Sequence, residues 1–390
     1  MRANGPIHTN QGTKMKVRIK VRALLFPLEL FSLVLASCWA HAQVSATRQI
    51  SVLAASPSGS GIVAVVHDDG GPQQARVFFI SLATGKIVWQ LVQSFSIGSV
   101  AVSPDGNTVA VGLVGVSDRD LGVLLLDARS GKQVGGIGDD ENSYFVPGLV
   151  YPRYGSGVSR LMYSPDGALL YGLSNDTLFA WDVAAKKYLW TQDVPAVIEA
   201  PPELPDPLPY GHATDFTLSP DGRQIAALRD VLRIATAGRT MPGHFIKRDP
   251  TGHAEIQTAV FSADSRILAA GEFGTTENGK TTFIATDLWI DGALKPVHID
   301  GCGDGIAWTG APDVFGCQND SGAHLRNIHD LQKDIGSAGP PGNLPILKVG
   351  NSLWSAAYKY GDWKDPAKPL TITLGELGTG HRVTLTLPGR

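Results

Sequence analysis

The chain has 390 residues, of which 43% are hydrophobic and 18% charged, as is typical of soluble globular proteins. Its 45 glycines and 25 prolines favour a fold with many turns. Residues 1–42 hold six Lys and Arg side chains and one Glu, which leaves 27 basic and 35 acidic residues in 43–390 and a net charge of −8 there. A body of this sign repels phosphate backbones, so we expect no nucleic-acid partner.

Residues 1–42 are predicted to be a signal peptide. Lys14–Arg22 is a basic segment, Ala23–Ala36 is apolar, and Ala40-His41-Ala42 fits the small-x-small rule for cleavage. Cleavage there makes Gln43 the mature N-terminus and places the protein in the periplasm or outside the cell. Initiation at Met15 would give this signal an ordinary length.

Two alternatives remain at the N-terminus. Leu35-Ala36-Ser37-Cys38 resembles the lipobox of bacterial lipoproteins, which implies lipidation at Cys38 and attachment to a membrane face. An uncleaved anchor ranks last, because the apolar stretch is shorter than the roughly 20 residues of a spanning helix and contains Glu29. No later segment is a transmembrane candidate.

The chain has three cysteines, and Cys38 is either removed with the signal peptide or lipidated. Cys302 and Cys317 remain in a compartment that permits disulfides. The sequence between them predicts strand, turn and strand over Gly305–Trp308, Gly310–Asp313 and Val314–Cys317. Such a hairpin brings the two cysteines together, and a disulfide here would contribute roughly 3 kcal/mol. The alternatives are two buried free thiols and a metal pair, which no CxxC or nearby His cluster supports.

A four-residue turn motif recurs along the chain. Proline presets φ at the second position of the turn, serine and aspartate bond to neighbouring backbone, and glycine accepts positive φ. An apolar, often alternating run follows each copy, as expected for a strand with a buried face. The copies are Ser56-Pro57-Ser58-Gly59, Ser103-Pro104-Asp105-Gly106, Ser164-Pro165-Asp166-Gly167, Ser219-Pro220-Asp221-Gly222, Ser262-Ala263-Asp264-Ser265 and, more degenerate, Gly310-Ala311-Pro312-Asp313.

A second turn follows each of the first three copies, after another predicted strand. A short strand comes next, and in two cases it contains a tryptophan, Trp89 or Trp190. These turns are Ala83-Thr84-Gly85-Lys86, Arg129-Ser130-Gly131-Lys132 and Ala184-Ala185-Lys186-Lys187.

Each unit therefore contains four short antiparallel strands, and radially repeated four-stranded sheets form a β-propeller. We predict an all-β fold in which residues 43–390 form one propeller of about seven blades, with six or eight as alternatives. The predicted units are 49–92, 97–138, 158–194, 213–246, 255–299, 304–335 and 345–388.

The repeats resemble those of the WD40 and YVTN-type propeller superfamily over about 43–390. The Ser-Pro-Asp-Gly turns match, Trp181-Asp182 matches the WD dipeptide, and Gly211-His212 and Gly252-His253 match the GH element. Only one true WD pair is present. The segment Thr84–Trp89 also resembles the repeat of quinoprotein-like propellers.

In this architecture the turns after the first and third strands lie on one face, and the long connections lie on the other. Two long connections, Asp139–Gly157 and Ala200–His212, flank the third unit and are candidate binding loops. The alternative is that they only cap blade edges. Their candidate contact residues are Tyr144, Phe145, Tyr151, Arg153, Tyr154 and Tyr210.

The sequence predicts no cofactor and no metal site. Asp139, Asp140 and Glu141 lack the ordered spacing of a calcium loop, and GxSxG, HExxH, P-loop and CxxCH motifs are absent. We therefore expect an exported, non-catalytic scaffold that binds proteins and contacts a membrane only if Cys38 is lipidated. The alternatives are a YVTN or lactonase-type enzyme with its site at the channel mouth and, less favoured, a quinoprotein dehydrogenase.

Intact-mass analysis of the protein, expressed with its native N-terminus in a Gram-negative host, tests these expectations. We expect a species that starts at Gln43 and is two hydrogens lighter than its reduced form, because Cys302 and Cys317 are oxidised. A species that starts at Cys38 and carries acyl chains would contradict simple cleavage and indicate a membrane-attached lipoprotein.

Overall fold

The computed structural model describes fourteen ranges of the chain. All helices and strands assigned in these ranges are β-strands, so the described fold is all-β. The ranges are 48–68, 74–114, 122–137, 157–174, 177–194, 215–228, 232–236, 244–246, 254–275, 281–293, 296–319, 322–338, 344–358 and 367–389. Residues Ser45–Arg390 form one compact unit. None of the described segments is a helix of the length and apolarity that crossing a membrane requires. The predicted signal peptide and the lipobox-like Cys38 lie outside the described residues.

The strands form seven four-stranded sheets, each made of four consecutive antiparallel strands. Blades 1 to 3 contain β1 (Arg48–Ala55), β2 (Gly61–Asp68), β3 (Gln74–Ser81), β4 (Ile87–Gln93); β5 (Ser96–Val102), β6 (Thr108–Val114), β7 (Val123–Asp127), β8 (Gln133–Ile137); and β9 (Val158–Tyr163), β10 (Leu169–Ser174), β11 (Thr177–Asp182), β12 (Lys187–Asp193).

Blades 4 to 7 follow the same plan. They contain β13 (Asp215–Leu218), β14 (Gln224–Leu228), β15 (Leu232–Thr236), β16 (His244–Ile246); β17 (Ala254–Phe261), β18 (Ile267–Thr275), β19 (Thr281–Ile290), β20 (Val297–Asp300); β21 (Asp304–Trp308), β22 (Val314–Asn319), β23 (Gly322–Asn327), β24 (Asp330–Ala338); and β25 (Leu344–Val349), β26 (Ser352–Tyr358), β27 (Leu370–Glu376), β28 (Arg382–Leu387).

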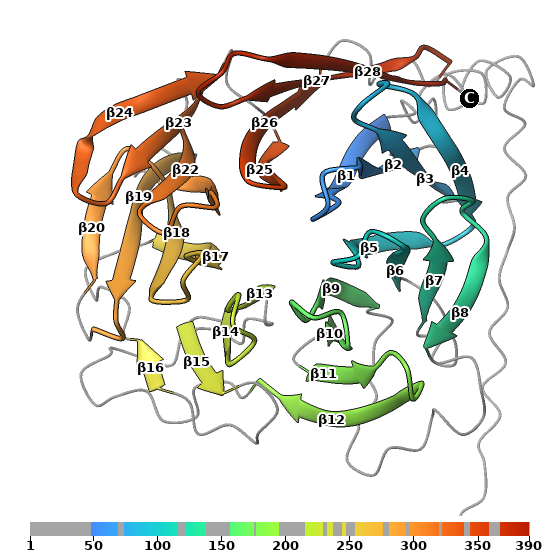
Figure 1. Ribbon diagram of the computed structural model, residues 1–390, viewed down its shortest axis with the longest axis horizontal. Coiled ribbons are helices and arrows are strands. Elements are labelled where there is room, and N and C mark those ends of the chain that lie inside the picture. Colours follow the sequence, from blue (N-terminus) through green and yellow to red (C-terminus); the bar gives the residue numbers. More distant parts are fainter. Residues whose placement is uncertain are drawn as a thin grey trace, which may run out of the picture. The chain divides into compact units, whose positions relative to one another are not determined.

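The blades form a closed ring around their first strands (Figure 1). Each first strand contacts the first strand of the next blade, in the order β1, β5, β9, β13, β17, β21, β25 and back to β1. The predicted all-β propeller is therefore confirmed, and the described strands form seven blades.

Buried apolar side chains fill the spaces between neighbouring blades. Between blades 1 and 2, for example, Val63, Val65 and Phe79 pack against Val109 and Val111. The alternating pattern of the strands accounts for this, because each inner strand presents apolar side chains to both of its faces.

The turns between first and second strands are built as the repeated motif predicts. Ser103 Oγ donates to Asp105 Oδ1 at 2.5 Å and accepts from Thr108 N at 2.9 Å, and Gly106 has φ +74°. In blade 5 Ser265 occupies the glycine position with φ +64°. In blades 2 to 5 the serine hydroxyl donates to the aspartate and accepts from a backbone N–H five residues later, and these bonds set the same tight turn.

Trp89 fastens blade 1 to blade 2. Its Nε1 donates to Ala128 O at 2.8 Å, and a Cβ at Gly131 would lie 2.7 Å from the indole ring. Gly131 also has φ +69°, so this turn requires glycine both for its conformation and for the close approach of the tryptophan.

The ring closes without exchange of a strand between its ends. Blade 1 consists only of β1–β4 and blade 7 only of β25–β28, and a shared cluster of buried apolar residues joins them. Arg76 on β3, only 8% exposed, donates from Nη1 to Pro388 O and Gly389 O, both at 3.2 Å. Its guanidinium carbon lies 5.6 Å from the centre of the Phe78 ring. The C-terminal end is thereby bound to the first blade.

Replacing Arg76 with Ala should lower the free energy of unfolding by about 2 kcal/mol, because two charge-assisted hydrogen bonds and a buried side chain are lost. Chemical denaturation measures this difference. The exposed Arg129 offers a matched control, and Arg129→Ala should change stability by less than about 0.5 kcal/mol. Equal stabilities of the two variants would contradict a role for Arg76 in ring closure.

Candidate functional site

The turns after the first strands form a collar on one face of the ring. A Cβ at Gly106 would lie 2.8 Å from Ser58 Oγ, and one at Gly167 would lie 3.4 Å from Pro104 Cδ. The N–H of Asp221 donates to Ser265 Oγ at 3.0 Å across the boundary between blades 4 and 5. Because neighbouring turns touch, this face is a rigid surface rather than a set of independent loops.

The aspartates of the collar favour the ionised state. Hydrogen bonds from Ser103 and from the backbone of Asn107 lower the pKa of Asp105, and Ser164 and the Ala168 N–H do the same for Asp166. Partial burial raises the pKa of Asp221, but hydrogen bonds from Ser219 and the backbone of Arg223 outweigh it, so the net shift is downward. The collar therefore carries fixed negative charge at neutral pH.

A pocket of about 370 Å³ lies between blades 4 and 5 on this face. Phe261, Leu268 and Trp289 provide its apolar lining. Its polar lining comes from the first turns of blades 4 and 5 and from the last turn of blade 5, and comprises Asp221, Gln224, Asp264, Ser265, Arg266 and Asp291.

The pocket has more negative than positive charge. Arg266 binds Asp291 with two bonds, Nε to Oδ1 at 2.7 Å and Nη2 to Oδ2 at 2.6 Å. The hydrogen bond to Arg266 lowers the pKa of Asp291 and raises that of Arg266. Asp221 and Asp264 add two carboxylates to the pocket. Arg223 makes only a long contact with Asp221, 4.0 Å from Nε to Oδ2. The pocket thus favours a cationic or hydrogen-bond-donating group.

Trp289 packs in a way that the WD dipeptide alone does not reveal. It lies on β19 opposite Leu268, as Trp181 lies on β11 opposite Leu170. Each tryptophan is buried, and neither Nε1 has a hydrogen-bond partner. Trp181-Asp182 therefore acts here through packing and through its carboxylate, which accepts from the Ala185 N–H at 2.7 Å.

An ion pair lies at the start of two neighbouring inner strands. Arg160 on β9 and Asp215 on β13 are 2.9 Å apart, Nε to Oδ1. Burial raises the pKa of Asp215, and the Arg160 charge and the Phe216 N–H oppose that rise. The predicted binding loops Asp139–Gly157 and Ala200–His212 precede these strands in sequence.

The loop residues themselves stay untested, because they lie outside the described residues, as do both GH elements and the acidic candidates for calcium. These residues are Tyr144, Phe145, Tyr151, Arg153, Tyr154, Tyr210, Gly211-His212, Gly252-His253, Asp139, Asp140 and Glu141. In the part of the chain that the structure describes, no group of three or more His, Cys, Asp or Glu side chains is placed to hold a metal ion.

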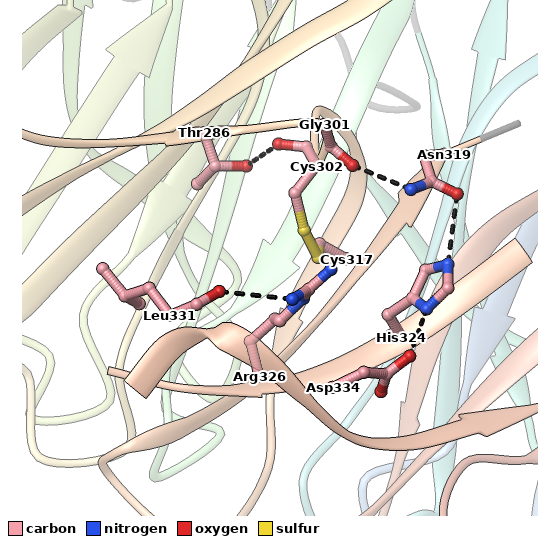
Figure 2. Close-up of a disulfide and its surroundings, with 9 residues drawn as sticks. All are labelled: Thr286, Gly301, Cys302, Cys317, Asn319, His324, Arg326, Leu331 and Asp334. Atoms are coloured by element: carbon pink, nitrogen blue, oxygen red, sulfur yellow. Dashed lines mark hydrogen bonds and ion pairs between the residues drawn. A yellow bond between two sulfur atoms is a disulfide. The ribbon is translucent and has the colours of Figure 1, made fainter. Parts of the chain in front are cut away.

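Cys302 and Cys317 form a disulfide with a Cα–Cα distance of 5.5 Å (Figure 2). The hairpin of β21 and β22 brings them together, as the sequence predicts. Both cysteines are fully buried. The bond fixes the connection between blades 5 and 6 to the second strand of blade 6, and Thr286 Oγ1 of blade 5 donates to Cys302 O.

A polar network continues from the disulfide to the outer strand of blade 6 (Figure 2). Asn319 Nδ2 donates to Gly301 O at 2.8 Å, and Asn319 Oδ1 lies 3.1 Å from His324 Nε2. His324 Nδ1 lies 2.5 Å from Asp334 Oδ2. These contacts hold the same connection from its other side, so the disulfide region is a structural joint between two blades.

No family model matches the chain. No curated protein matches it either. Solved structures do match. A chain of Kuenenia stuttgartiensis hydrazine synthase superposes with a TM-score of 0.56 at 12% identity, covering 90% of this chain and 98% of that chain.

A chain of a mitotic checkpoint complex gives a TM-score of 0.55 at 16% identity, with coverage of 85% and 90%. The β-propeller domain of Myceliophteria thermophila Cps50 (Swd1) gives 0.52 at 12%, with coverage of 86% and 95%. The chain is a β-propeller. At these low sequence identities the similarity shows the fold alone. The predicted resemblance to WD40-like repeats is therefore confirmed as a similarity of fold.

Sequence reasoning found the turns and the disulfide but neither the pocket nor the Arg160–Asp215 pair. The residues of the pocket are separated by up to about seventy positions and meet only where two blades join. The one available signal was the repeated aspartate of the turn motif, which places Asp221 and Asp264 at equivalent positions of adjacent blades.

Replacing Asp166 with Asn should lower the free energy of unfolding by about 1 kcal/mol at pH 7, because neutral hydrogen bonds replace charge-assisted ones. The pKa of Asp166 is lower in the folded than in the unfolded chain, so its contribution is present above about pH 4 and lost as pH falls through the folded pKa. Denaturation between pH 7 and pH 3 should therefore show the two proteins converging at low pH. A difference that does not depend on pH would contradict this role. As a control, Asp330→Asn, at the exposed start of β24, should change stability at pH 7 by less than about 0.5 kcal/mol.

Proposed function

We propose that this chain is an exported, non-catalytic propeller that binds a protein partner through its collar face. The observation that carries the proposal is the pocket between blades 4 and 5. It combines apolar lining from Phe261 and Trp289 with the carboxylates of Asp221 and Asp264 on a rigid collar. In many protein interfaces one large side chain of the partner fills a pocket, and the surrounding contacts exclude water.

The size and charge of the pocket define the group that fits. A volume of about 370 Å³ is at the lower end of ligand pockets and accommodates one long side chain with its neighbouring backbone. An arginine or lysine of a partner would place its apolar stem against the aromatic lining and its charge near the carboxylates. The export signal predicted for residues 1–42 supports a periplasmic or extracellular location for this contact.

Site-specific photo-cross-linking tests the proposal in cells that produce the full chain. A photoreactive residue in place of the exposed Arg266, at the pocket, should cross-link to a protein partner in the periplasmic fraction. The same residue in place of Lys333, on the last strand of blade 6, is the matched control and should give much less of that product. Equal cross-linking at both positions, or none at Arg266, would argue against binding at the pocket.

A further inference from the structure

Exposed aliphatic side chains recur on the outermost strands of the blades. Most large hydrophobic side chains of the described residues are buried, but six on these strands are between 41% and 58% exposed. They are Val88 and Val92 on β4, Val134 on β8, Leu189 on β12, Val297 on β20 and Ile335 on β24.

A β-bulge lies at an exposed side chain in blades 1, 2, 3 and 6, whereas Val92 and Val297 are exposed at paired positions. In blade 1 Phe79 pairs with Trp89 and Ile80 pairs with Ile87, so Val88 is the extra residue of the outer strand. The register shifts at Val134, Leu189 and Ile335 in the same way. An extra residue has no cross-strand partner, so its exposed side chain is available for other contacts.

An exposed lysine lies two residues before each of these extra residues in blades 1 to 3, at Lys86, Lys132 and Lys187. Arg129 and Lys186 add two more exposed cations in the same turns. Within the described part of the chain, none of the five forms an ion pair with a side chain.

These turns contain fewer carboxylates than cations, and each carboxylate already accepts a local hydrogen bond. Asp127 accepts from the N–H and the hydroxyl of Ser130, and Asp182 accepts from the Ala185 N–H. Strands β4 and β8 contain no charged residue, whereas β12 begins at Lys187 and ends at Asp193. Five cations and two carboxylates give this edge a net charge of +3, in a body that has a net charge of −8 over residues 43–390. We call it the basic edge: the turns after the third strands of blades 1–3 together with Val88, Val134 and Leu189.

Blade 6 has the same spacing in a different electrostatic setting. Lys333 precedes Ile335 by two residues, but Asp330 and Asp334 lie on the same strand. Ile335 is 45% exposed, close to the 47% of Val88 and Leu189. Blade 6 therefore has an exposed aliphatic side chain and a lysine without an excess of positive charge, and it serves as a comparison.

We propose that the basic edge is a contact surface for anionic phospholipid membranes. Cations beside short aliphatic side chains are the pattern of interfacial membrane contacts, in which the cations bind headgroups and the aliphatic groups enter the boundary with the acyl chains. The three aliphatic groups are on separate blades, each beside its own lysine. A protein interface instead needs a central, water-excluding cluster around an anchor, so the arrangement favours an extended anionic surface.

This contact goes beyond the proposed binding of a protein at the pocket and does not depend on it. The pocket is formed by blades 4 and 5, whereas the basic edge is formed by blades 1 to 3. The two surfaces therefore share no residue. It also differs from lipidation at Cys38, because it needs only folded residues of the propeller.

Vesicle flotation and co-sedimentation test the proposal with the full chain carrying Cys38→Ser, so that no acyl chain contributes. The probes are phosphatidylcholine vesicles with and without about 30% phosphatidylglycerol. We expect binding to the anionic vesicles only, and weaker binding at higher salt because the attraction is screened. The Lys86→Gln, Lys132→Gln, Lys187→Gln variant should bind about 100-fold more weakly, because each cation near an anionic surface contributes about 1 kcal/mol.

Two further variants separate the contributions. Val88→Ser, Val134→Ser, Leu189→Ser should weaken binding while leaving the salt dependence in place, because the charges remain. Lys333→Gln, Ile335→Ser makes one change of each kind in blade 6 and should bind like the parent protein. Thermal unfolding of each variant confirms that it is folded before binding is compared.

Three results would overturn the proposal. The first is equal binding of the parent protein to anionic and neutral vesicles, and the second is equal affinity of the lysine variant and the blade 6 control for the anionic vesicles. The third is binding of soluble polyglutamate, lost in the lysine variant, without binding to vesicles, which would indicate an acidic protein partner instead. Cross-linking at Arg266 would be unaffected by each of these results, so the failure of one proposal is distinguishable from the failure of the other.

Discussion

The chain closes its ring by packing blade 1 against blade 7, and among the described strands none is shared between them. In the described residues, side chains hold this junction: an apolar cluster joins the two blades, and Arg76 binds two carbonyl groups after the last strand. An open array of blades would leave the apolar faces of blades 1 and 7 in water, at a cost of about 25 cal/mol for each Å² exposed. This junction buries those faces and completes the ring that carries the collar, the pocket and the basic edge.

The repeated turn has both a structural and an electrostatic role. Serine and aspartate bond to the local backbone and set the tight turn, and the same bonds keep the carboxylates ionised on the collar face. Where two such turns meet the last turn of blade 5, the result is a pocket with a surplus of negative charge. Local turn chemistry thus becomes a surface property when the ring places equivalent turns side by side.

Charge is distributed unevenly over the described surface. The collar contains the carboxylates of Asp105, Asp166 and Asp221, whereas Lys and Arg side chains lie in the turns after the third strands of blades 1 to 3. Exposed aliphatic side chains lie on the outer strands of blades 1, 2, 3, 5 and 6. The bulges at Val88, Val134 and Leu189 also interrupt the regular pairing of the outer strands of these sheets. Such irregular edges are poor templates for edge-to-edge pairing between molecules.

The sequence by itself determined the repeating unit, because turn residues and alternating strands are local signals that survive without knowledge of the fold. It placed the turns at Ser103-Pro104-Asp105-Gly106 and its copies, the hairpin between Cys302 and Cys317, and a ring of about seven blades. Only the tertiary structure decided which residues of different blades meet: Arg76 with the C-terminal carbonyls, Arg160 with Asp215, and Asp221 with the turn of blade 5. The bulges were likewise hidden, because Val88 and its counterparts read as ordinary strand residues until the pairing register is known. These contacts join positions far apart in the chain, and their geometry depends on ring closure, which no local pattern encodes.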